Sequence, residues 1–330
     1  LPTIDLSNLN LTDVAVPNQI QNLDIDQIRM GMDYELVNQD EGITMPMQYS
    51  LQHNSTLYFI QPAISKDNLG SLTFSIQESN KYRENPVFEF IERDNNRLYI
   101  YENGEPVMAY NFGKIWQIGV PRDRARQDYI HPIYGLDGEI VSDDFPGDHY
   151  HHRGLFWTWP QVKAGDTKVD LWHLNLGNQQ FGEWLYREKG SVCASFGAKN
   201  YWIADGERVA EEIVEIAVYR TSEVGRAIDV RLRLRSLDEK VTIEGKVGAG
   251  YGGFNFRPAP REKSSTIITT SEGVQEKDSN LVPFPWGDFS AKFRGRDTMS
   301  GVAIFIDDQH VGFPLGWTLR YYGFLGAAWP

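Results

Sequence analysis

The residues best suited to chemistry lie in one short segment, 143–154, which reads DDFPGDHYHHRG. It holds three of the chain's seven histidines, together with three aspartates and an arginine. Imidazole is the side chain whose ordinary pKa lies nearest neutrality, so histidines beside carboxylates and a guanidinium suit proton transfer or metal binding. The aromatic stretch FWTW follows directly at 156–159. Titratable groups beside flat apolar rings are what a sugar-binding active site needs, and we predict a functional site here.

The spacing of the histidines allows a metal site. If the segment is extended, His149 and His151 share one face of the strand and His152 points away from it. A His-x-His pair is a common geometry for zinc or copper when a third ligand completes it. The candidates for the third ligand are His173, Asp148 and His131.

Acid–base chemistry on a carboxylated sugar is the preferred interpretation. The guanidinium of Arg153 would pair with the carboxylate of the substrate, and the imidazole of His151 or His152 would move the proton. Asp148 would orient one of the imidazoles through its other ring nitrogen. The alternative is that these histidines cap turns or bind buried carbonyl groups.

Four aromatic or carboxylate side chains outside the histidine segment are candidates for substrate binding. Trp157 and Trp159 follow it directly, and strand alternation at 169–173 would place Asp170 and Trp172 on one face. An indole can stack on a pyranose ring while the carboxylate binds its hydroxyl groups. The alternative is an outward polar residue beside a tryptophan that packs under a loop.

The stretch 248–257, GAGYGGFNFR, has four glycines in six positions. It lacks the spacing and the helix of a dinucleotide-binding loop, so a bulged strand near a ligand or another strand is the better interpretation. Tyr251 is then a candidate acid, and Arg257 a second candidate for holding a carboxylate. The alternative is a strand corner with no ligand.

Composition limits the possible partners. The net charge of −13 argues against nucleic acids and anionic membranes, which require basic surfaces. No apolar run approaches the roughly 20 residues that span a bilayer. The single cysteine, Cys193, excludes an internal disulfide. The chain opens at Leu1 without methionine, so we expect a processed periplasmic or extracellular protein. The last residues are apolar, which suggests a shortened C-terminus.

Short β-patterns separated by turn residues run along the whole chain. Alternating segments such as 97–101, 107–110, 213–219 and 228–234 predict half-buried strands, and no segment has a convincing helical period. The sequence therefore predicts an all-β sandwich. We expect a small β-sandwich-like domain over residues 1–85 and a large β-domain with the histidines over 86–330.

Three motifs in the second region resemble a known family. DHYHHRG at 148–154, VDLW at 169–172 and WTLRYYG at 317–323 are similar to the bacterial family labelled "methane oxygenase PmoA-like", a domain of unknown function common in polysaccharide-degrading bacteria. The resemblance covers about residues 85–330 and implies a β-supersandwich of the galactose-mutarotase type. Methane oxidation is set aside, because the membrane oxygenase needs transmembrane helices.

The leading hypothesis is an enzyme of polysaccharide breakdown that removes a proton next to a carboxylate, as in lyase, dehydratase or epimerase chemistry. His151 or His152 would be the base, Arg153 would stabilise the developing charge, and Tyr251 would protonate the leaving group. The substrate would be an acidic oligosaccharide. No cofactor is expected, although a divalent metal is possible.

Three alternatives remain open at this stage. A glycoside hydrolase would use carboxylates such as Asp148, Asp170 or Glu183. A metalloprotein would hold its ion on histidines. A non-catalytic sugar-binding protein would depend on Trp157 or Trp172 and would keep its affinity without the histidines.

Overall fold

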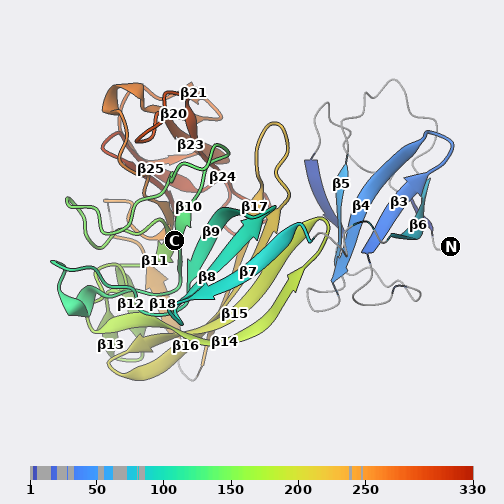
Figure 1. Ribbon diagram of the computed structural model, residues 1–330. Coiled ribbons are helices and arrows are strands. Elements are labelled where there is room, and N and C mark those ends of the chain that lie inside the picture. Colours follow the sequence, from blue (N-terminus) through green and yellow to red (C-terminus); the bar gives the residue numbers. More distant parts are fainter. Residues whose placement is uncertain are drawn as a thin grey trace.

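The computed structural model describes residues 3–5, 16–20, 28, 33–50, 56–61, 73–79, 81, 86–237, 240–246 and 248–329. Among these residues the chain forms antiparallel strands and two short 3-10 turns, η2 (Arg122–Arg124) and η3 (Lys263–Ser265), with no α-helix (Figure 1). The predicted all-β, sandwich-like fold is confirmed. The reason lies in the alternation of side chains: β17 (Ile228–Ser236) reads IDVRLRLRS, so its aliphatic residues face the core while its charged residues face outward.

The first part of the chain forms a six-stranded sheet in the order β1-β6-β3-β4-β5-β2. Its strands are β1 (Thr3–Asp5), β2 (Val16–Ile20), β3 (Asp33–Asn38), β4 (Ile43–Ser50), β5 (Thr56–Gln61) and β6 (Thr73–Ser79). The sheet has its own apolar cluster, which includes Leu36, Met47, Leu57 and Phe74. The predicted boundary at residue 85 lies outside the described residues, between Lys81 and Pro86.

Several contacts join this sheet to the rest of the chain. The side-chain carbonyl of Gln48 accepts hydrogen bonds from the backbone N–H groups of Val192 and Cys193, at 3.3 and 3.0 Å. The rings of Tyr58 and Tyr219 meet edge to face, with their centroids 6.0 Å apart. Cys193 is buried in this contact region and forms no disulfide.

The rest of the chain is organised around a nine-stranded sheet, in the order β22-β25-β26-β19-β11-β10-β9-β8-β7. Its strands are β7 (Phe88–Arg93), β8 (Arg97–Glu102), β9 (Glu105–Asn111), β10 (Tyr129–Ile133), β11 (Leu155–Thr158), β19 (Gly253–Phe256), β22 (Ser279–Pro283), β25 (Gly316–Arg320) and β26 (Phe324–Ala328). The histidine segment lies between β10 and β11, so central strands of this sheet hold it at both ends.

Three smaller sheets complete the fold. The long strands β14 (Gly177–Lys189), β15 (Cys193–Ala204), β16 (Glu207–Tyr219) and β17 form one of them. A second contains β12 (Gln161–Ala164), β13 (Thr167–Val169) and β18 (Val241–Glu244). The third contains β20 (Ile267–Thr270), β21 (Gly273–Val274), β23 (Trp286–Ala291) and β24 (Ser300–Phe305).

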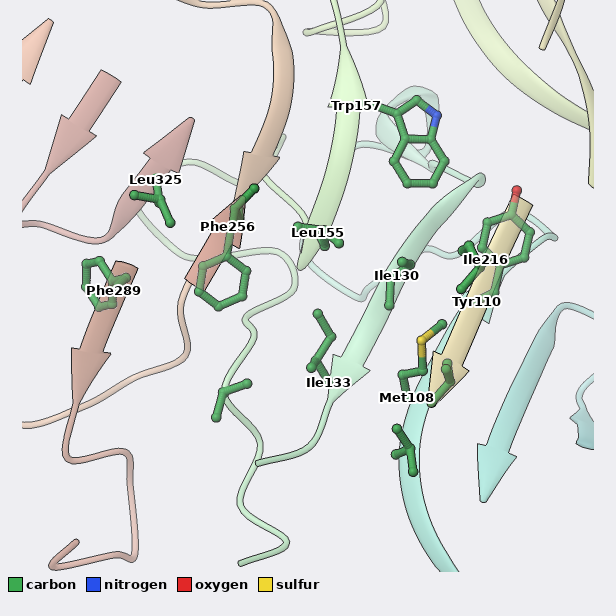
Figure 2. Packing of buried hydrophobic residues seen from close by; sticks show 14 of the residues in the cluster. Met108, Tyr110, Ile130, Ile133, Leu155, Trp157, Ile216, Phe256, Phe289 and Leu325 are labelled. Carbon is green, nitrogen blue, oxygen red and sulfur yellow. The ribbon is translucent and has the colours of Figure 1, made fainter. Parts of the chain in front are cut away.

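The main core fills the space between the nine-stranded sheet and its neighbours. Figure 2 shows Met108, Tyr110 and Ile130 from adjacent strands of the large sheet close to Ile216 of β16. The same cluster continues to Phe289 of β23, so one core joins both smaller four-stranded sheets to the large one. Each fully buried side chain of this size contributes about 1.5–3 kcal/mol to stability.

A buried carboxylate lies within this core. Glu212 accepts hydrogen bonds from the indole N–H groups of Trp157 and Trp202, at 3.0 and 2.8 Å, and from the side-chain amides of Asn200 and Gln179. Burial raises the pKa of Glu212, while these four donors act against that rise. The network satisfies the polar atoms of both tryptophans inside an apolar core.

The glycine-rich stretch is explained by backbone contacts. Gly253 has a φ of +113° on β19, and a Cβ atom there would lie 2.3 Å from the carbonyl oxygen of Ala327 on the paired strand β26. Gly250 has a φ of +67° in the preceding turn. The glycines therefore permit a left-handed turn and close strand pairing, as in the bulged-strand interpretation.

Candidate functional site

The histidine segment folds as a turn and not as an extended strand. The N–H group of His149 donates to the carbonyl of Pro146, and that of His152 donates to the carbonyl of His149, at 3.1 and 2.8 Å. The turn stacks the imidazoles of His149 and His152, whose centroids are 4.8 Å apart with an interplanar angle of 9°. The expectation that His152 points away from His149 was wrong, because it assumed the two-residue period of a strand.

Four histidines gather at this turn, and we call them the histidine cluster: His149, His151, His152 and His173. The ring of His151 is central, with centroids 5.6 Å from His149, 4.7 Å from His152 and 4.7 Å from His173. His173 comes from the loop that follows β13, which is closed by backbone hydrogen bonds between Asp170 and Asn175.

Two of the four imidazoles are each paired with an aspartate. Nδ1 of His149 lies 3.2 Å from Oδ2 of Asp148, and Nδ1 of His173 lies 2.7 Å from Oδ2 of Asp170. Burial acts to raise the pKa of both aspartates, but their hydrogen bonds outweigh it and lower the pKa of each. Both carboxylates stay charged. Asp170 orients the ring of His173 so that its Nε2 is left for chemistry, and Asp148 lies beside Nδ1 of His149.

The other two imidazoles are held neutral. Burial, followed by the neighbouring histidines and arginines, lowers the pKa of His151 to about 3 and lowers that of His152 further still. His152 is only 2% exposed and packs against Phe324 and Trp172, with centroids 5.1 and 5.8 Å away. These contacts give His152 a packing role, and its predicted catalytic role stays a prediction.

Arg153 is also buried, with no exposed surface. Its guanidinium donates to three backbone carbonyls and lies 3.7 Å from the ring centroid of Phe145. Those carbonyls belong to Tyr150, His152 and Arg124. Its Nε lies 3.4 Å from the carboxylate of Asp144. The structure thus places the Nη donors of Arg153 on backbone carbonyls, which supports a structural role, and its predicted catalytic role stays a prediction.

Arg257 is the cation that faces the cluster. It is 6% exposed, and its Nη2 donates to Oδ1 of Asp148 at 2.6 Å. Within the described part of the chain, its Nε and Nη1 are buried and have no hydrogen-bond partner. A buried donor without a partner costs about 1–3 kcal/mol. Nε–H and Nη1–H lie on different edges of the guanidinium, and each can donate a charge-assisted hydrogen bond to an anion, which suits the predicted role of Arg257.

The tryptophans predicted to bind substrate are core residues. Trp157, Trp159 and Trp172 are 0%, 2% and 2% exposed. Trp157 lies on the central strand β11, and Trp159 and Trp172 are each part of a buried apolar cluster. None of them offers a ring face for stacking, and this part of the prediction is corrected. The accessible rings near the cluster are those of Tyr322 and Tyr150, which are 39% and 41% exposed. Tyr322 stacks on His149 at 5.2 Å.

The remaining predicted residues take different positions. The ring of Tyr251 lies 5.4 Å from that of Trp172, at the border of the cluster. Glu183 lies on β14 in an exposed ion pair with Lys199, where Nζ and Oε1 are 2.7 Å apart. Asp170 belongs to the cluster through His173 and offers its carboxylate to that imidazole.

Two arginines that the sequence analysis missed shape the loop of His173. Arg126 is 3% exposed, and its Nη2 donates to the carbonyls of Leu171 and Trp172 at 2.7 and 2.8 Å. Arg124 donates to the carbonyl of His173 and, at 2.8 Å, to Oδ1 of Asn175. Both are positioning residues. Their only signal in the sequence is the alternating RDRAR at 122–126.

The described residues contain no group of three or more histidine, cysteine, aspartate or glutamate side chains arranged to hold a metal ion. His131, a candidate third ligand, is instead placed on β10 with its Nδ1 2.9 Å from Oγ of Ser142. It has no ring contact with His149 or His151 among the described residues.

His131 gives a prediction for stability. Burial, followed by Arg97 and Arg153, lowers its pKa from 6.5 to about 3. Between these two values the unfolded chain binds a proton that the folded chain does not. The free energy of unfolding should therefore decrease as pH falls through this window, by roughly 1 kcal/mol per pH unit for this one group. Denaturant unfolding across the window should show a shallower slope for His131→Asn; an unchanged slope would contradict the assignment.

These features define an all-β protein with four clustered histidines beside a buried arginine. Residues 97–329 match a family of unknown function, DUF6807, and the chain belongs to this family. The match covers all three motifs, at 148–154, 169–172 and 317–323, and it gives neither an activity nor the PmoA-like label. No curated protein and no solved structure matches the chain. In the described residues, no helix is long and apolar enough to cross a membrane.

Proposed function

We propose that the histidine cluster is the active site of an enzyme that moves protons on a carboxylate-bearing sugar, in a lyase, dehydratase or epimerase reaction. One observation carries the proposal. Two aspartate-oriented imidazoles, His149 and His173, flank His151 next to the unpaired donors of Arg257. A base, an acid and a cation for the carboxylate are the parts that such a reaction requires.

Arg257 has the role of binding the carboxylate. Its Nε–H and Nη1–H groups, which have no partner among the described residues, would donate hydrogen bonds to the substrate carboxylate, and its charge would stabilise the enolate-like intermediate. An anion bound there would satisfy these buried donors and so remove the free-energy cost of burying them without a partner.

The imidazoles move the proton. Nε2 of His173, oriented by Asp170, removes the hydrogen from the carbon next to the carboxylate, and the electron pair of that C–H bond enters the enolate. In an epimerase, His149 returns a proton to the opposite face of the carbon. In a lyase or dehydratase, the C–O bond at the next carbon breaks, and His149 or Tyr251 protonates the leaving oxygen.

The neutral imidazole of His151 allows a positive charge to form on the neighbouring His173. The pKa of about 3 means that no third positive charge competes with the imidazolium formed on His173. The exposed rings of Tyr322 and Tyr150 supply flat apolar surface for the sugar.

A substrate screen tests the proposal. The protein is incubated with uronates and their oligosaccharides, and unsaturated products are followed by ultraviolet absorbance and epimers by NMR. Arg257→Gln should lower kcat/KM by about 100-fold or more, because two charge-assisted hydrogen bonds are lost. The control is Arg235→Gln, which removes an exposed surface arginine paired with Glu211. Full activity of Arg257→Gln would contradict the proposal.

A further inference from the structure

A concave site lies beside the loop that carries His173. It is a cavity of about 270 Å³ lined by Lys114, Arg122, Leu174, Leu176 and Asn178, and we call it the loop cavity. The loop that carries His173 also supplies part of its wall, since Leu174 is the next residue. The loop cavity is thus separated from the cluster by a single loop.

Arg124 ties the two sites together. Its neighbours on both sides, Asp123 and Ala125, line the loop cavity. Its own guanidinium donates to the carbonyl of His173 and the side chain of Asn175. A ligand that reaches from the cluster over this loop would therefore meet the loop cavity next.

The lining has a positive character that contrasts with the net charge of −13. Arg122 lies over the ring of Trp116 at 4.5 Å, which holds the guanidinium by its face and leaves its edge N–H groups for a ligand. Lys114 adds a second cation. The carboxylate of Asp123 is directed to Arg124, with Nε and Oδ2 3.8 Å apart.

The loop itself is held in a strained form. Leu174 and Leu176 have φ angles of +59° and +58°, a region that costs a leucine roughly 1–2 kcal/mol. Leu176 is also 71% exposed, so burial of its own side chain does not offset the strain. Strain of this kind persists where the surrounding structure fixes it, and it clusters at ligand-binding sites.

We propose that the loop cavity binds an anionic group, a carboxylate or a sulfate, on the unit next to the one held at the histidine cluster. The substrate is then an acidic oligosaccharide with a charged group on successive units. Lys114 and Arg122 hold the anion, and the two leucines contact the apolar face of the sugar. This inference rests on the proposed function of the cluster.

Calorimetry with defined ligands tests the proposal. The probes are galacturonate and glucuronate, their trisaccharides, and inorganic sulfate. For the uronate that binds, the Kd of the trisaccharide should be about tenfold or more lower than that of the monomer, because the trisaccharide makes one further charge-assisted contact. The double variant Lys114→Gln, Arg122→Gln should lose that gain and bind the monomer as before. Lys163→Gln, an exposed position on β12, is the control.

The outcomes separate the two proposals. If the double variant keeps the full gain of the trisaccharide, the loop cavity is not the second site. If no uronate binds the unaltered protein, the proposed function fails. The binding of inorganic sulfate then tests the anion site in the loop cavity by itself. If the native protein binds sulfate and the double variant does not, the anion site is supported. If both proteins bind sulfate, or if neither does, the anion site is overturned.

Discussion

Replacing His173 with glutamine is expected to lower the kcat of proton transfer by about 100- to 10,000-fold, the range of a positioned general base. Glutamine still offers an N–H group to Asp170 but cannot accept a proton at neutral pH. KM should change little, because Arg257 binds the carboxylate. Steady-state kinetics on a substrate from the screen would measure both constants.

The matched control for this variant is His310→Gln. His310 contacts the ring of Trp329, at 5.2 Å between centroids, and takes no part in the histidine cluster. It should keep full activity. If His173→Gln keeps the native kcat, His173 is not the base. The same holds if the variant loses activity only because it is unfolded, as a lower melting temperature would show.

Replacing Arg153 with methionine is expected to reduce the free energy of unfolding by about 3–5 kcal/mol, the cost of removing one partner from a buried ion pair. The change removes the cation beside the carboxylate of Asp144, which is 11% exposed on its side chain and keeps the hydrogen bond from the Tyr129 hydroxyl. It also leaves the carbonyls of Tyr150 and His152 without their donor. Urea unfolding measures the loss.

A lysine variant sharpens this test. Arg153→Lys keeps the charge near Asp144 but loses the guanidinium N–H groups that donate to several carbonyls. Its free energy of unfolding should therefore lie between those of the native protein and Arg153→Met. A methionine variant with native stability and no activity would instead show that Arg153 serves catalysis.

The fold class could be predicted because alternation is a local property. Segments such as 228–234 carry their burial pattern within a few residues, whatever strand they pair with. Which strands become central depends on pairings between distant segments. For that reason the position of Trp157 at the middle of a nine-stranded sheet was missed, and an indole next to the histidines was taken for a stacking surface.

The gathering of histidines in one segment could be predicted from the sequence, but the burial of each one could not. The sequence places His149, His151 and His152 in one segment. The backbone turn of that segment determines which of the three imidazoles is buried. Arg153 adjoins them in sequence and points into backbone. Arg257, more than 100 residues away, reaches Asp148 instead. Direction and burial of a side chain are set by tertiary contacts, which neighbours in the sequence do not reveal.

Exchange of the hydrogen next to the carboxylate with solvent deuterium, followed by NMR on a uronate ligand, tests proton transfer at the histidine cluster most directly. We expect exchange with the native protein, strongly reduced exchange with His173→Gln, and native exchange with His310→Gln. A uronate that binds through Arg257 and shows no exchange, or exchange that His173→Gln leaves unchanged, would contradict proton transfer at the histidine cluster.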